Sequence, residues 1–127
     1  MTVAFWCVLI AFLLPYVCTY IAKFGGGYRL SDNHDPRDFL DSIGGLPRRA
    51  HSAQLNGFEI TPFFAAAVII AHLTGGALQV TVDVLSILFV TSRLLYIIFY
   101  LMDWATLRSL VWFVGLMMIV GLFIAAA

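Results

Sequence analysis

Four long apolar segments dominate this chain, and they restrict its fold more than any other feature. The segments cover residues 3–22, 48–73, 78–101 and 107–127. Each is long enough to cross a hydrocarbon core of about 30 Å as a helix. A segment inside that core has no water to bond, so it must satisfy its backbone groups internally. We therefore predict an all-α fold: an integral membrane four-helix bundle with four transmembrane helices, in one domain over residues 1–127.

The amino-acid composition also indicates that the chain lies in a lipid bilayer. Hydrophobic residues make up 62% of the 127 residues and charged residues only 11%, whereas a soluble domain has about 25% charged residues. The formal net charge is zero, which gives no reason to expect nucleic acid as a partner. Cys7 and Cys18 both fall in the first apolar segment, where we expect them to be buried as small hydrophobic residues.

The first apolar segment has two interpretations, a signal peptide and an uncleaved span. The segment is longer than a typical signal-peptide core and no basic residue precedes it, which favours the span. Pro15 predicts a kink within this helix. Tyr20 and Lys23 are expected to anchor its end at the membrane interface.

Residues 23–47 form the only long polar segment and are predicted to be a loop. Glycines at 25–27 and the sequence Gly44-Gly45-Leu46-Pro47 are turn signals. The acidic residues and histidine at 32–38 allow a metal site as one interpretation. A solvated surface loop is favoured, because their spacing matches no metal-ligand pattern. One short interfacial turn is expected at 38–41.

The basic residues predict the orientation of the chain. They cluster in or beside the first loop and just after the third: Lys23, Arg29, Arg37, Arg48, Arg49 and Arg108. The second loop and both termini have no Lys or Arg. Basic loops stay on the cytoplasmic side, so the first and third loops should be cytoplasmic and both termini periplasmic or lumenal.

Polar side chains from three spans are predicted to meet near the cytoplasmic face. They are Arg49, Asn56 and Glu59 at the start of the second span, Arg93, Tyr96 and Tyr100 at the end of the third, and Arg108 and Ser109 at the start of the fourth. Offsets of three and four residues put the members from each helix on one face. Because a charge inside a membrane normally has a partner, we predict an ion pair between Glu59 and Arg93.

These residues resemble the MAPEG family, the membrane-associated proteins in eicosanoid and glutathione metabolism, and its bacterial members in particular. Three motifs carry the resemblance, in order along essentially the whole chain: Asn56-x-x-Glu59-x-x-Pro62, Arg93-x-x-Tyr96-x-x-x-Tyr100 and Arg108-Ser109.

The resemblance implies a homotrimer in a bacterial inner membrane, in contact with lipids. Glutathione would bind between subunits near the cytoplasmic face, as co-substrate for a lipophilic small molecule. The implied glutathione contacts are Asn56, Glu59, Arg93, Tyr96 and Tyr100. Arg108 corresponds to the arginine that stabilises the thiolate, and Ser109 follows it.

One position departs from the family pattern. Many family enzymes have an arginine four residues before the asparagine, where it holds a glutathione carboxylate, and here that residue is Ser52. Arg49 lies one turn earlier on the same face and Arg48 is adjacent, so these two are the candidates to replace it.

Each of these residues also has a purely structural interpretation. Glu59 and Arg93 could only hold two helices together, the tyrosines could belong to an interfacial aromatic belt, and Arg108 could be a topology anchor. Three functional classes remain: a glutathione-dependent transferase or peroxidase, a non-catalytic lipid-binding or scaffold protein, and a small four-span transporter. The transporter would need an acid in its first span, and residues 3–22 contain none.

Overall fold

The computed structural model describes residues 1–127 and contains only helices. They are α1 (Val3–Gly26), the 3-10 helix η1 (Leu30–His34), α2 (Pro36–Ser42), α3 (Gly45–Thr74), α4 (Gln79–Leu101) and α5 (Ala105–Ala126). The four long helices are each long and apolar enough to cross a membrane. The predicted all-α bundle of four membrane-spanning helices is therefore confirmed.

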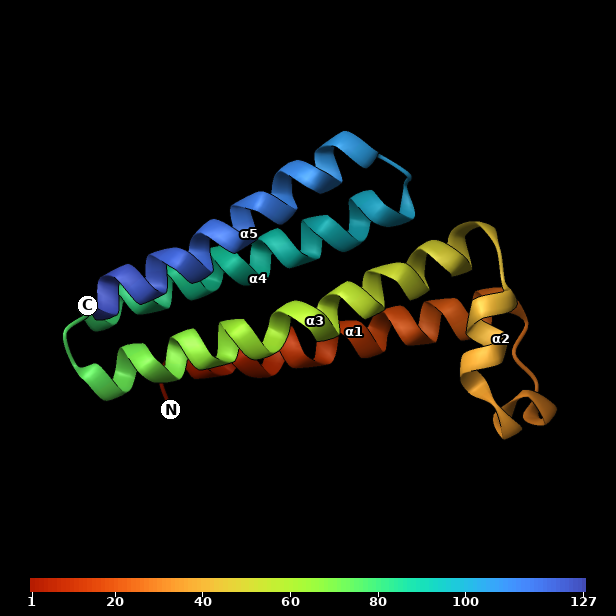
Figure 1. The fold of residues 1–127 in the computed structure, drawn as a ribbon, viewed down its shortest axis with the longest axis horizontal. Helices are drawn as coiled ribbons and strands as arrows, with labels where there is room; N and C mark the ends of the chain where they lie inside the picture. Colours follow the sequence, from red (N-terminus) through yellow and green to blue (C-terminus); the bar gives the residue numbers. More distant parts are fainter.

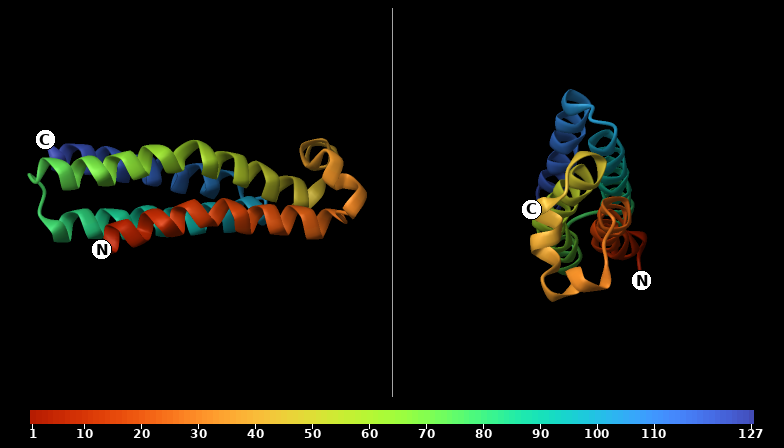
Figure 2. Two further views of the ribbon diagram at one scale, coloured as in Figure 1. Left: turned by 90° about the horizontal axis from the view of Figure 1, so that it is seen from below. Right: turned by 90° about the vertical axis from the view of Figure 1, so that its right-hand side faces the viewer.

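The long helices form two pairs, α1 beside α3 and α4 beside α5 (Figure 1). The pairs lie closest at the end that carries the α3–α4 turn, and they diverge toward the end that carries the α4–α5 connection (Figure 1). Both termini lie at the closed end, while η1 and α2 lie at the open end in both views (Figures 1 and 2). The basic segments 23–49 and 104–108 are thus at one end of the bundle, as the predicted topology requires.

The polar segment is more ordered than predicted. Gly25 and Gly26 were expected in a loop, but α1 continues through both and ends at Gly26, and the next residue, Gly27, has a left-handed φ of 77°. A Cβ on Gly26 would lie 3.1 Å from side-chain atoms of both Phe39 and Ile43, so this glycine lets the connection pack closely on the end of α1. The short turn expected at 38–41 is part of α2.

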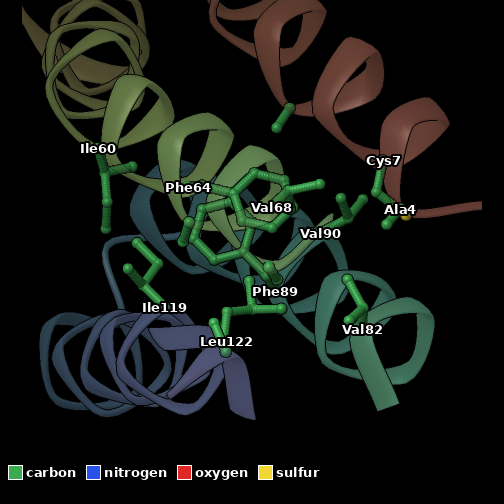
Figure 3. Close-up of a cluster of buried hydrophobic side chains, with 14 residues drawn as sticks. Ala4, Cys7, Ile60, Phe64, Val68, Val82, Phe89, Val90, Ile119 and Leu122 are labelled. Carbon is green, nitrogen blue, oxygen red and sulfur yellow. The ribbon is translucent and has the colours of Figure 1, made fainter. Parts of the chain in front are cut away.

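The main core joins all four long helices from mid-height to the closed end. Phe64 of α3 stacks on Phe89 of α4 with ring centroids 3.9 Å apart, and both side chains are fully buried (Figure 3). Residues such as Cys7 of α1 and Leu122 of α5 complete this cluster. Only 27 of the 127 residues are buried, and large apolar side chains remain exposed on every long helix. That surface suits lipid rather than water.

Glycines set the closest helix approaches. A Cβ on Gly57 would lie 2.6 Å from Cγ of Pro15, and one on Gly115 would lie 2.7 Å from Oγ of Ser92. Gly115 therefore has the close-packing role expected of a small residue between membrane helices. Pro15 lies within α1 and has no N–H to give to the carbonyl of Ala11. The hydroxyl of Thr61 on α3 donates to the carbonyl of Gly57 at 2.7 Å and lies 3.4 Å from that carbonyl of Ala11.

Polar contacts tie the closed end together. Asp83 of α4 accepts a hydrogen bond from the backbone N–H of Ala4 at 2.9 Å, which caps the start of α1. His72 of α3 lies 3.1 Å from the hydroxyl of Thr2, through Nε2. The N-terminal end of α1 is thus held by both neighbouring helices.

Candidate functional site

Two tyrosines lie in contact between two arginines along the last turns of α4 and the start of α5. The guanidinium carbon of Arg93 lies 4.1 Å from the ring centroid of Tyr96, and that of Arg108 lies 4.4 Å from the ring centroid of Tyr100. The two tyrosine rings meet edge to face at 5.5 Å. Both arrangements are favourable, because the ring faces are electron-rich. We call this set the cation–tyrosine ladder.

Asn56 connects the ladder to α3. Nη2 of Arg93 donates to Oδ1 of Asn56 at 2.8 Å, and Nδ2 of Asn56 lies 3.5 Å from Oε2 of Glu59. The predicted direct ion pair between Glu59 and Arg93 is therefore wrong, since Asn56 lies between them. Arg93 is only 4% exposed whereas Glu59 is exposed. A carboxylate that stays outside avoids the desolvation cost of joining the buried guanidinium.

Arg93 is a buried cation without an acidic partner. No carboxylate lies within ion-pair distance of it, and its Nη1 atom is buried with no hydrogen-bond partner. Its charge is offset only by the Asn56 oxygen and the Tyr96 ring. The end of α4 therefore keeps a positive charge inside the bundle, where the surroundings screen it weakly.

The two arginines next to Ser52 are both bound to backbone carbonyls. Nε and Nη2 of Arg49 donate to the carbonyl of Leu101 at 3.2 and 3.1 Å, where they cap the end of α4. Arg48 donates to the last carbonyls of α2. The structure thus separates Arg49 from the other predicted site residues.

Two open pockets lie on the surface where α3, α4 and α5 meet. The first, about 240 Å³ in volume, is the arginine pocket and is lined by Tyr96, Tyr100, Arg108, Ser109 and Trp112. The second, about 230 Å³ in volume, is the glutamate pocket and is lined by Asn56, Glu59, Ile60, Phe63, Trp112 and Leu116. Trp112 belongs to both, so the two pockets are neighbours.

Six of the eight predicted site residues line these pockets, and sequence reasoning missed Trp112. Arg93 lies behind Tyr96 as support, and Arg49 lies apart. The hydroxyl of Ser109 donates to the carbonyl of Ala105 at 3.1 Å. Trp112 follows Arg108 by four residues, so it shares the same face of α5, and that spacing was the available signal.

The comparison with known families fits these observations. The profile of the MAPEG family matches residues 3–127, nearly the whole chain. The chain belongs to the MAPEG family. No curated protein and no solved structure matched it. MAPEG membership and the four apolar helices make this an integral membrane protein, of the family that acts in glutathione and eicosanoid metabolism.

No group of three His, Cys, Asp or Glu side chains that could hold a metal occurs in this MAPEG chain. The acids of the polar segment serve the local backbone instead. Oδ2 of Asp32 accepts from the N–H of Arg29 at 2.7 Å, and Oδ1 of Asp35 accepts from the N–H of Asp38 at 3.2 Å. The segment is therefore built as a capped pair of short helices.

The two pockets of the MAPEG chain have opposite chemistry. The arginine pocket offers a guanidinium and two phenol groups, which suit an anion. The glutamate pocket offers a carboxylate and an amide, which suit a cation. A ligand that carries both kinds of charge can contact both pockets across Trp112.

Proposed function

We propose that this protein is a glutathione-dependent transferase or peroxidase that acts on lipophilic electrophiles or hydroperoxides. The observation that carries the proposal is the pairing of an anion-binding and a cation-binding pocket around Trp112. Glutathione has two carboxylates, one ammonium and a thiol. Guanidinium groups bind carboxylates with two parallel hydrogen bonds, and a glutamate binds an ammonium. The family membership supports glutathione over other ligands of mixed charge.

Arg108 is the residue that stabilises the glutathione thiolate. A thiol has an unperturbed pKa of about 8.5, so most of it is protonated at neutral pH. A guanidinium beside the sulfur, at the positive end of the α5 dipole, favours the thiolate. Lowering the thiol pKa by about two units corresponds to roughly 2.7 kcal/mol. The guanidinium of Arg108 lies over the Tyr100 ring and makes no hydrogen bond or ion pair within the chain, so its N–H groups are free to bind an anion.

The remaining residues bind and orient the peptide. Glu59 binds the ammonium, with Asn56 beside it. Tyr96 and Tyr100 offer hydroxyl groups to the anionic part, and Ser109 can do so once its hydroxyl leaves the carbonyl of Ala105. Arg93 acts from behind through Asn56 and Tyr96, since its buried charge raises the local positive potential.

The chemical step needs only the thiolate and a lipophilic partner. With an electrophile, the sulfur attacks carbon, a C–S bond forms, and the electron pair leaves with the displaced group. With a hydroperoxide, the sulfur attacks the terminal oxygen, the O–O bond breaks, and the alcohol forms after it takes up a proton. A second glutathione then converts the sulfenic acid to the disulfide and water. The apolar partner enters from the bilayer past exposed residues such as Phe63.

The proposed assembly is a homotrimer in a bacterial inner membrane. Both pockets are open, so a neighbouring subunit would cover them and exclude water. The basic loops face the cytoplasm and both termini face the periplasm, which agrees with the position of the basic segments at the open end of the bundle.

A second function is favoured by one observation. Ser52 provides no cation, and Arg48 and Arg49 are both bound to backbone carbonyls. A site without a free arginine for the second carboxylate is what a non-catalytic lipid-binding or scaffold member of the family would have.

Calorimetry of glutathione binding to detergent-purified protein separates the two functions. We expect the wild type to bind glutathione, Glu59→Ala to bind it more weakly, and the surface variant Arg29→Ala to bind it like the wild type. Thiolate ultraviolet absorbance near neutral pH should be present in the wild type and lost in Arg108→Ala. No heat from the wild type at millimolar glutathione would favour the scaffold function.

A further inference from the structure

A third pocket lies outside the proposed glutathione site, between α2 and the start of α3. This α2 pocket has a volume of about 370 Å³ and is lined by Arg37, Leu40, Asp41, His51, Gln54, Leu55 and Phe58. It shares no residue with the arginine or glutamate pocket. Its location at the loop end of the bundle puts it at the level of the lipid headgroups.

The pocket is walled by a fixed element, because α2 is held against α3. Nη1 of Arg48 donates to the carbonyls of Leu40 and Asp41, at 3.2 and 3.1 Å. The same atom lies 3.4 Å from Oδ1 of Asp41. These contacts satisfy the last carbonyl groups of α2 and pair its terminal acid with a cation. The pocket is therefore part of the fold rather than a gap in a loose loop.

The polar side of the pocket carries one uncommitted charge, and that charge is positive. His51 is 5% exposed, with Nδ1 3.2 Å from Oε1 of Gln54 and Nε2 3.6 Å from Oδ1 of Asp41. Asp41 is thus occupied by Arg48 and His51. Arg37 is exposed and makes no side-chain hydrogen bond or ion pair. An anion would find in Arg37 a free donor.

The apolar side of the pocket continues toward the membrane centre. Leu40 is buried, whereas Leu55 and Phe58 are 48% and 37% exposed. Phe58 follows Arg48 by ten residues, which is about 15 Å along the helix. The pocket thus has its polar side at the headgroup level and its apolar side at the level of the acyl chains.

We propose that the α2 pocket binds a membrane phospholipid with an anionic headgroup. The phosphodiester is bound by Arg37 and by the amide N–H₂ of Gln54, whose oxygen faces His51. One acyl chain lies along Leu55 and Phe58. The charge of Arg37 favours anionic over zwitterionic lipids. A zwitterionic headgroup carries an ammonium that Arg37 repels, whereas the headgroup of phosphatidylglycerol carries no ammonium.

Native mass spectrometry of the full-length protein, released from bilayers with equal amounts of phosphatidylglycerol and phosphatidylcholine, tests this. We expect the wild type to retain phosphatidylglycerol in preference. Arg37→Gln should lower that retention about fivefold, which is the effect of one cation near an anionic lipid. Arg29→Gln is the matched control, because it removes the same charge from the same loop outside the pocket, and it should retain the lipid as the wild type does. Leu55→Gln should lower retention of both lipids.

Three results would overturn the proposal. Equal losses in Arg37→Gln and Arg29→Gln would mean that general loop charge attracts the lipid. Equal retention of the two lipids by the wild type would mean that the pocket does not select a headgroup. Loss of the oligomer in Arg37→Gln would identify the pocket as a contact with a second copy of the chain. An unchanged circular dichroism spectrum for each variant excludes unfolding as the cause.

Discussion

The guanidinium carbon of Arg108 on α5 lies 4.4 Å from the centre of the Tyr100 ring on α4. This contact joins two helices at the open end of the bundle, and it fixes the cation proposed to meet the glutathione sulfur. Arg108 contacts the face of the Tyr100 ring and not its hydroxyl group. Separate substitutions can therefore test the aromatic ring and the hydroxyl group.

Replacing Tyr100 should raise the pKa of the bound glutathione thiol. Tyr100→Leu removes the ring face, worth about 0.5–1 kcal/mol for an exposed cation–π contact, so the thiolate loses stabilisation. We expect the apparent thiol pKa to move about half a unit toward 8.5. Tyr100→Phe keeps the face and should leave the thiol pKa of bound glutathione as in the wild type, although it removes the hydroxyl proposed to contact the anionic part of the peptide. A pH titration of thiolate absorbance measures this, and equal shifts in both variants would assign the role to the hydroxyl instead.

Asn56→Ala should destabilise the protein by about 1–3 kcal/mol, because it leaves the buried Arg93 without its hydrogen-bond acceptor. Glu59→Gln should change stability by much less, because Glu59 is exposed and does not contact Arg93. Thermal unfolding in detergent compares the two variants. A loss in Glu59→Gln as large as that in Asn56→Ala would mean that Glu59 and Arg93 interact directly after all.

Gly57→Ala should destabilise the contact between α1 and α3 by about 1–3 kcal/mol. The added Cβ would lie 2.6 Å from Cγ of Pro15, a distance that forces the backbones apart. Gly121→Ala is the matched control, because its nearest neighbour would be an ordinary 3.5 Å contact with Leu85. Unfolding midpoints should differ between these variants. Pro15→Ala combined with Gly57→Ala should recover part of the loss by relieving the clash.

Asp83→Ala should loosen the first turn of α1, because the N–H of Ala4 loses its acceptor. The cost should be about 1 kcal/mol, as for other lost helix caps. Hydrogen exchange should increase at residues 4–7 and stay unchanged near Phe64. Unchanged exchange at the start of α1 would show that the cap contributes nothing measurable to the stability of that turn.

The sequence predicted the four spans and the closeness of Asn56, Tyr96, Tyr100 and Arg108 for physical reasons that residue types reveal. The length of an apolar segment predicts whether it crosses a membrane, the positions of basic residues predict the orientation, and the spacing of residues predicts which of them share a helix face. Depth along each span then follows, so residues on different helices are assigned to the same level.

The incorrect predictions concern which groups bind each arginine and which helices each glycine brings together, and residue types do not reveal these partners. Arg49 binds the carbonyl of Leu101, and a backbone acceptor has no signature in the sequence. Asn56 rather than Glu59 accepts the hydrogen bond from Arg93. The two candidates are only one helical turn apart and differ in side-chain length, and the residue types do not show which of them lies within reach of the guanidinium. Gly57 was missed because its role depends on Pro15 of another helix.

The divergence of the two helix pairs separates the two charges of the proposed glutathione site, because Glu59 belongs to the α1–α3 pair and Arg108 to the α4–α5 pair. The pairs are joined on both sides of this site: Asp83 of α4 binds Ala4 of α1 at the closed end, and Arg49 of α3 binds the carbonyl of Leu101 of α4 at the other end. The spacing of the two charges is therefore set by the frame of the bundle, so a ligand that bridges them is selected by its length.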